Sequence, residues 1–232
     1  STEQAALERA ERIQTEIDQW LDLCPLPALM QDDQGLLLQL DGTFADGRMV
    51  LVPDVLTALQ NLAAQYRNTF QIPVLGITGS NGKTTTKELL YSVLSKKYKT
   101  HVTKGNLNNH IGLPLTILSM PADTEMAVIE MGANHPGEIA FTSAYARPEI
   151  SVITNVGRAH IAGFGDLLGV AKTKGEIVES LAADGTAVLN ADDAFFPYWQ
   201  EVAAERQIRS FGLSKTADIQ AEQIFSELTD QG

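Results

Sequence analysis

The stretch that decides the fold spans residues 72–88 and reads I-P-V-L-G-I-T-G-S-N-G-K-T-T-T-K-E. Its beginning, residues 74–77, is a short apolar run, which is typical of a strand buried on both faces of a parallel sheet. A polar loop with two glycines follows. After Lys83 the apolar residues recur with helical spacing. The stretch therefore predicts a strand, a tight loop and a helix, whose core-facing stripe we expect to contain Leu89, Leu90, Val93 and Leu94.

The loop between this strand and this helix has the composition of a phosphate-binding loop. Its glycines let backbone N–H groups converge on an anion, and the helix N-terminus adds a partial positive charge. Lys83 would reach the terminal phosphates of ATP, and the Thr84 hydroxyl would ligate Mg²⁺. The general pattern G-x-x-x-x-G-K-[ST] places a glycine where Ile77 stands, so a turn without a ligand is the alternative. The lysine and the threonines at the helix start favour phosphate binding by Gly79, Ser80, Asn81, Gly82, Lys83, Thr84 and Thr85.

The composition excludes several classes of protein. The 232 residues include 17 Lys and Arg but 29 Asp and Glu, for a net charge of −12, which argues against a general binder of nucleic acid or anionic membranes. Cys24 is the only cysteine, so no intrachain disulfide can form, and the first residues lack the basic start and apolar core of a secretory signal. We therefore expect a cytoplasmic protein that contacts neither nucleic acid nor membrane.

Short apolar runs alternate with amphipathic stretches along the rest of the chain. Strands are expected at residues 74–77, 101–103, 126–131, 150–153, 186–189, 208–211 and 218–220. Besides the helix that begins at Lys83, helices are expected at residues 3–21, at 55–66 after an N-cap at Asp54, and at 137–146, 167–181 and 194–205. The alternation predicts an α/β fold with a doubly wound, mostly parallel sheet.

Glu130 stands near the C-terminal end of the apolar strand at residues 126–131. A buried carboxylate is costly unless it is paired or binds a cation, and ligands of open α/β sheets gather at the carboxyl ends of the strands. We therefore predict that Glu130 is a Mg²⁺ ligand that faces Thr84 across the nucleotide. The alternative is an ordinary glutamate at a strand end.

Other polar loops allow two interpretations from the residues alone. The loop at residues 106–112 contains Asn108 and Asn109, which suit either substrate contacts or an Asx-rich turn. His135 suits a substrate contact or a helix start, whereas we assign Glu138 to the helix start. The run at residues 190–193 either borders a nucleotide pocket or caps the next helix.

Several blocks resemble the Mur ligases, a family of ATP-dependent amide ligases that build the peptide of peptidoglycan. Beside T-G-S-N-G-K-T-T, the blocks are G-N-L-N-N-H-I-G at 105–112, I-E-M-G-A-N-H-P-G-E-I at 129–139, T-N-V-G-R-A-H-I-A-G-F-G at 154–165, A-K-T-K-G-E-I at 171–177 and L-N-A-D-D at 189–193. They follow the order of the family and cover roughly residues 55–220.

The resemblance implies a carboxylate–amine ligase that uses ATP and two Mg²⁺ ions. The substrates it implies are UDP-N-acetylmuramoyl-tripeptide, whose carboxylate becomes an acyl phosphate, and D-alanyl-D-alanine, whose amine displaces the phosphate. Asn108 and Asn109 then become substrate contacts. His160 matches a ligand of the second Mg²⁺, and Lys174, rather than Lys172, matches a lysine that CO₂ carbamylates. We expect such a ligase to be a monomer.

The resemblance also suggests a division of the chain. Residues 54–220 would form the ATP-binding central domain, residues 1–53 an appendage without a motif that assigns it a role, and residues 221–232 a tail where the family's C-terminal domain would begin. Two other functional classes stay open. One is another amide ligase of the superfamily, such as folylpolyglutamate synthase, and the other is a nucleotide-binding module without turnover.

Overall fold

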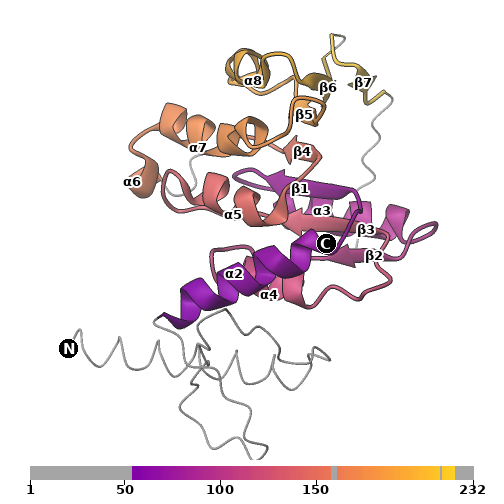
Figure 1. The fold of residues 1–232 in the computed structure, drawn as a ribbon. Coiled ribbons are helices and arrows are strands. Elements are labelled where there is room, and N and C mark those ends of the chain that lie inside the picture. Colours follow the sequence, from indigo (N-terminus) through magenta and orange to yellow (C-terminus); the bar gives the residue numbers. More distant parts are fainter. Residues whose placement is uncertain (1–53, 158–160, 215, 223–232) are drawn as a thin grey trace, which may run out of the picture.

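The computed structural model describes residues 54–157, 161–214 and 216–222 of the chain (Figure 1). The helices are α2 Val55–Asn68, α3 Lys83–Leu94, α4 Gly112–Leu118, α5 Glu138–Ala146, α6 Ile161–Phe164, α7 Leu167–Glu179 and α8 Phe196–Ala203. The strands are β1 Val74–Thr78, β2 Thr100–Val102, β3 Met126–Glu130, β4 Ile150–Ile153, β5 Thr186–Asn190, β6 Gln207–Gly212 and β7 Ile219–Gln220.

The strands form one sheet in the order β2-β3-β1-β4-β5-β6-β7, and every neighbouring pair is parallel. The strand that leads into the glycine loop, β1, lies between β3 and β4. After β1 the chain forms β2 and β3 on one side of it and then crosses to form β4 to β7 on the other side. The carboxyl end of β1 therefore marks the point where the strand order reverses. In open α/β sheets, ligands bind at such a point.

Two hydrophobic clusters cover the two faces of the sheet. The larger contains Val74 of β1 with Ala127 and Ile129 of β3, and it includes residues of α2, α4, α5, α7 and α8. The smaller contains Ile77 and Val128 and is covered by Leu90 and Leu94 of α3 (Figure 1). Alternate residues of one strand therefore contribute to opposite cores, which explains why the central strands β1 and β3 are apolar on both faces.

The predicted doubly wound α/β fold is confirmed, with a sheet that is parallel throughout. The stripe predicted on α3 is partly wrong. Leu89 and Val93 are 63% and 69% exposed, and only Leu90 and Leu94 pack against the sheet. The reason is geometric: the two pairs form adjacent i,i+4 rows on the helix, and only one row faces the strands.

Helix α4 was not among the predicted elements, since its sequence Gly-Leu-Pro-Leu-Thr-Ile-Leu contains both residues that usually interrupt a helix. Pro114 is tolerated because it lies in the first turn, where its missing N–H has no intrahelical partner anyway. The helix predicted at residues 3–21 lies outside the described residues. Among the described helices, none is both long and apolar enough to cross a bilayer.

Candidate active site

A cavity of about 270 Å³ opens at the carboxyl edge of the sheet. It is lined by residues from the glycine loop, from the segments after β2 and β3, and from α7. These residues are Gly79, Ser80, Lys83, Asn108, Asn109, His110, Gly132, Ala133, Asn134, Glu138 and Lys174. The topology thus brings together blocks that are far apart in the sequence.

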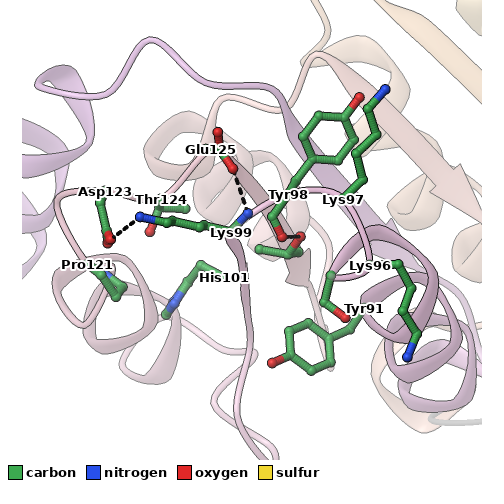
Figure 2. Close-up of a pocket in the computed structure, with 12 residues that line it drawn as sticks. Tyr91, Lys96, Lys97, Tyr98, Lys99, His101, Pro121, Asp123, Thr124 and Glu125 are labelled. Atoms are coloured by element: carbon green, nitrogen blue, oxygen red, sulfur yellow. Dashed lines mark hydrogen bonds and ion pairs between the residues drawn. The ribbon is translucent and has the colours of Figure 1, made fainter.

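A wider hollow of about 640 Å³ lies at the opposite edge, near the amino ends of β2 and β3 (Figure 2). Its polar contacts include the ion pair of Lys99 Nζ with Asp123 Oδ2 at 2.8 Å, in which both side chains are about two thirds exposed. None of the residues predicted to bind ATP, metal or substrate lines it. The candidate active site is therefore the smaller cavity, which several of the predicted site residues line.

The glycine loop adopts the backbone that phosphate binding requires. Gly79 has φ +146° and Gly82 has φ +78°, both in the region that L-residues rarely adopt. Gly82 is also the N-cap of α3, so the loop ends on the positive end of a helix. A Cβ at Gly79 would collide with the Thr154 hydroxyl, so both conformation and space demand glycine there.

Lys83 folds back over this loop. Its Nζ donates to the Gly79 carbonyl at 2.7 Å and lies 3.5 Å from the Ser80 carbonyl. Burial lowers the pKa of the Lys83 ammonium, while the charge of Glu130 acts in the opposite direction. The ammonium is therefore held at the loop by neutral carbonyls, which a phosphate can replace.

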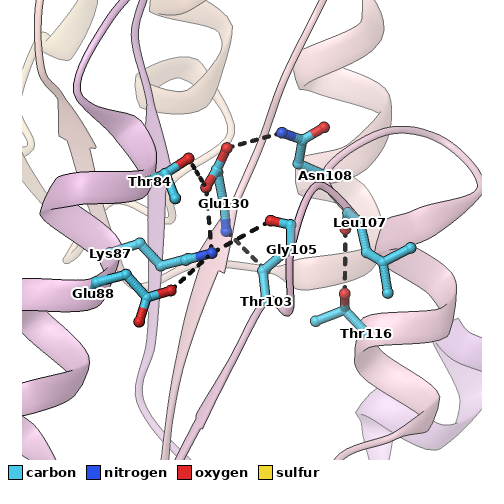
Figure 3. A network of polar contacts seen from close by, with 9 residues as sticks. All are labelled: Thr84, Lys87, Glu88, Thr103, Gly105, Leu107, Asn108, Thr116 and Glu130. Carbon is cyan, nitrogen blue, oxygen red and sulfur yellow. Dashed lines mark hydrogen bonds and ion pairs between the residues drawn. The ribbon is translucent and has the colours of Figure 1, made fainter.

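Glu130 is the centre of a polar network (Figure 3). Its Oε2 accepts from Thr84 Oγ1 at 3.1 Å and its Oε1 accepts from Asn108 Nδ2 at 2.8 Å. Its backbone N–H donates to Thr103 Oγ1 at 2.9 Å, and only 2% of the residue is exposed. The structure therefore brings together the two oxygen ligands predicted from the sequence.

Mg²⁺ prefers oxygen ligands and usually keeps several water molecules, so one hydroxyl and one carboxylate fit the protein's share of such a site. Within the described part of the chain, no three His, Cys, Asp or Glu side chains gather closely enough to hold a metal alone. The residues present thus suit a metal that arrives with a nucleotide.

Lys174 is 3% exposed and lines the cavity, whereas Lys172 is exposed. Burial and, to a smaller extent, the ammonium of Lys83 lower the pKa of Lys174 to about 8, although Glu176 and Glu138 act in the opposite direction. Its Nζ also lies 5.6 Å from the centre of the Phe164 ring. The side chain is therefore an unusually acidic lysine beside the glycine loop.

The predicted substrate contacts differ in position. Asn108 and Asn109 both line the cavity, but the Asn109 Oδ1 also accepts from the N–H groups of Ile111 and Gly112, so the loop is an Asx turn as well. His135 is exposed and does not line the cavity. His160 lies outside the described residues.

Acidic side chains near the site organise its loops. Glu138 accepts from the N–H groups of Asn134 and His135, in agreement with a role at the helix start. Asp193 accepts from Val156 N and Phe195 N at 2.7 and 2.9 Å. The run at residues 190–193 therefore holds backbone together, and none of it lines the cavity.

Three further residues that shape this site were not predicted from the sequence. Thr154 Oγ1 donates to the Asn81 carbonyl at 2.7 Å, and Asn155 bonds to both backbone groups of Asn81. Lys87 is fully buried beside Glu130. The position of Lys87 one helical turn after Lys83 was the available signal, but lysines on helices are usually solvated.

Fold and site together define a P-loop nucleotide-binding α/β domain. The Mur ligase middle domain matches residues 77–232 of the sequence, which is more than half of the chain. The chain belongs to the Mur ligase family.

Similar proteins of known name support this membership. The UDP-N-acetylmuramoyl-tripeptide–D-alanyl-D-alanine ligase of Bacillus subtilis is 44% identical over 176 residues, which cover 76% of this chain and 38% of that protein. The ligase of the same name from Escherichia coli is 44% identical over 162 residues, which cover 70% of this chain and 36% of that protein. The chain therefore spans less than half the length of these relatives.

Among solved structures, the MurF ligase of Thermotoga maritima in complex with ADP superposes with a TM-score of 0.70 at 36% identity, over 80% of this chain and 43% of that one. The central sheet and its helices are thus shared with a protein crystallised with a nucleotide.

Proposed function

We propose that this chain binds Mg-ATP at the carboxyl edge of its sheet and is the nucleotide-binding part of a ligase that joins D-alanyl-D-alanine to UDP-N-acetylmuramoyl-tripeptide. The observation that carries the proposal is the cavity lined by the glycine loop, Asn108 and Lys174. Glu130 is joined to this lining because it accepts hydrogen bonds from Asn108 and from Thr84. Residues 54–220 would form this unit, acting in the cytoplasm as a monomer. The names of the similar ligases support the choice of substrates.

The backbone N–H groups of residues 79–84 would bind the phosphates, with Thr85 in the next helical position. Lys83 Nζ would leave the Gly79 carbonyl, 2.7 Å away, for a phosphate oxygen. This exchange replaces a neutral acceptor by an anionic one, which strengthens the hydrogen bond. The loop and Lys83 thereby neutralise charge that develops as a carboxylate attacks the γ-phosphate.

Thr84 and Glu130 would hold the first Mg²⁺, whose chemistry is to neutralise phosphate charge. Their oxygens already lie 3.1 Å apart, and Asn108 and Thr103 orient Glu130 from the other sides. The protein thus presents the two ligands before the nucleotide arrives. Preorganisation of this kind lowers the cost of binding.

A carbamate on Lys174 together with His160 would hold the second Mg²⁺. Carbamylation needs an uncharged amine, and the lowered pKa of about 8 makes that form accessible near neutral pH. Asn108 and Asn109, which line the cavity, would contact the peptide substrate. His135 would be a further substrate contact from outside this lining.

Nucleotide binding is tested by the shift in melting temperature of the 232-residue chain with Mg-ATP. We expect a clear upward shift in the wild type, equivalent to about 2.7 kcal/mol at a hundredfold excess over the dissociation constant. Lys83→Ala should abolish the shift, and Lys172→Ala, which removes an exposed lysine, should retain it. An equal shift in Lys83→Ala and in the wild type would refute the assignment of the loop.

The ligase assignment is tested by phosphate release with Mg-ATP, UDP-N-acetylmuramoyl-tripeptide and D-alanyl-D-alanine, each omitted in turn. Release that needs all three would support it, and release with glutamate in place of the dipeptide would favour a folylpolyglutamate synthase type of reaction. Nucleotide binding without release would restrict the proposal for this chain to nucleotide binding.

A further inference from the structure

A second lysine of α3, Lys87, lies fully buried beneath the site (Figure 3). It follows Lys83 by four residues and Thr84 by three, so the three side chains share one flank of the helix. A buried ammonium is strongly unfavourable unless negative groups compensate it. The groups around Lys87 therefore indicate which negative charge its ammonium compensates.

The Lys87 ammonium lies between two carboxylates and a carbonyl. Its Nζ is 3.2 Å from Glu88 Oε1, 3.6 Å from Glu130 Oε2 and 3.4 Å from the Gly105 carbonyl to which it donates. The Glu88 side chain is 58% exposed, whereas that of Glu130 is 2% exposed. Water weakens the first interaction more than the second but does not abolish it, so the fully buried charge pair is Lys87 with Glu130.

One oxygen of Glu130 is shared. The Oε2 atom that faces Lys87 also accepts from the Thr84 hydroxyl. A divalent cation between Thr84 and Glu130 would bind that same oxygen and lie close to the Lys87 charge. Orientation of the carboxylate does not depend on Lys87 alone, because Asn108 holds Oε1 and Thr103 holds the backbone.

We infer that Lys87 is the internal counter-charge of Glu130 and competes with the divalent cation for this carboxylate, which weakens metal binding. The inference rests on the proposed metal position at Thr84 and Glu130. Lys87 is a positioning residue, since it acts through Glu130. Its charge keeps the carboxylate compensated before a cation binds and makes the cation easier to release afterwards.

The test is a titration of the 232-residue chain with Mn²⁺ at one fixed, saturating concentration of ADP, with free Mn²⁺ measured by electron paramagnetic resonance. Binding of Mn²⁺ by ADP in solution is then the same for every variant. Lys87→Met should tighten the Mn²⁺ dissociation constant roughly fivefold, because the unpaired carboxylate gains more from a cation. Lys87→Arg and the exposed control Lys96→Met should stay within about twofold of the wild type.

If Lys87→Met does not fold, Glu88→Gln provides a second test of the inference. The exposed Glu88 carboxylate draws part of the Lys87 charge away from Glu130, so its loss should weaken Mn²⁺ binding roughly twofold. An unchanged or weaker affinity in Lys87→Met, or an unchanged or tighter affinity in Glu88→Gln, overturns the inference. Mn²⁺ binding by the wild type that persists in Glu130→Gln would instead refute the proposed metal position.

Discussion

The side-chain amide of Asn155 and the backbone of Asn81 exchange two hydrogen bonds. Asn81 N–H donates to Asn155 Oδ1 at 3.1 Å, and Asn155 Nδ2 donates to the Asn81 carbonyl at 3.1 Å. Asn155 follows β4, so this pair fixes the middle of the glycine loop to the neighbouring strand. An amide suits both groups, because it carries a donor and an acceptor on separate atoms side by side.

Asn155→Ala should therefore weaken nucleotide binding. Loss of two hydrogen bonds of about 1 kcal/mol each would raise the dissociation constant of ATP roughly tenfold or more. The measurement is fluorescence titration with an ATP analogue. Asn61→Ala, at an exposed position of α2, is the matched control and should bind as the wild type does. Equal affinity in the two variants would show that the loop keeps its shape without Asn155.

Gly79→Ala should disrupt the loop more severely. The new Cβ would collide with Thr154 Oγ1, which cannot withdraw without losing its bond to the Asn81 carbonyl. We expect loss of the ATP-dependent melting shift and a decrease of about 2 kcal/mol or more in the free energy of unfolding. Gly105→Ala is the control, because Gly105 has φ +51° but open space around it. That variant should lose about 1 kcal/mol of stability from backbone strain and keep its nucleotide affinity.

Carbamylation of Lys174 should increase with pH at a fixed CO₂ partial pressure. With a pKa of about 8, the neutral amine rises from about a tenth of the population at pH 7 to about nine tenths at pH 9. Carbon-13 NMR with labelled CO₂ would detect the carbamate signal. The signal should persist in Lys172→Arg and disappear in Lys174→Arg, and a signal that follows Lys172 instead would reassign the modified residue.

Ser151→Ala should not destabilise the sheet. Ser151 lies in the middle of β4, is fully buried, and its hydroxyl has no hydrogen-bond partner among the described residues. Removing an unpaired polar atom should leave the free energy of unfolding unchanged or raise it by about 1 kcal/mol. Chemical denaturation measures this. Ser210→Ala, which loses hydrogen bonds to Asp218, should cost about 1 kcal/mol, and a larger loss in Ser151→Ala would contradict the prediction.

Much of the fold was predictable, because the central strands β1, β3 and β4 are largely apolar runs bounded by polar or turn residues. The strand and helix around the loop, from Val74 to Leu94, follow from hydrophobic pattern and glycine position. Placement of Glu130 opposite Thr84 followed from one rule, that parallel strands present their carboxyl ends at one edge. These predictions depend on local pattern and on topology, which a sequence carries.

Other features depend on contacts between distant segments. The pattern of α3 could not tell which of its two apolar rows faces the sheet, and Leu89 and Val93 proved to be exposed. The burial of Lys87 was not predictable from its own helix, because its partner Glu130 lies on strand β3, more than 40 residues later. His135 follows the strand that carries Glu130, but the chain turns so that Asn134 lines the cavity instead.

The central place of β1 in the sheet also has a consequence for folding, because β1 is synthesised before both strands that pair with it. Leu75 pairs with Val128 on one side and with Ile150 on the other, and both partner strands are synthesised after β1. Until β3 and β4 have been synthesised, both edges of β1 are unpaired. Unpaired strand edges are prone to pair with non-native strands. The contacts that hold Asn81 in the glycine loop need Asn155, which is synthesised more than 70 residues later, so the most recognisable segment of the sequence cannot be completed from its own residues.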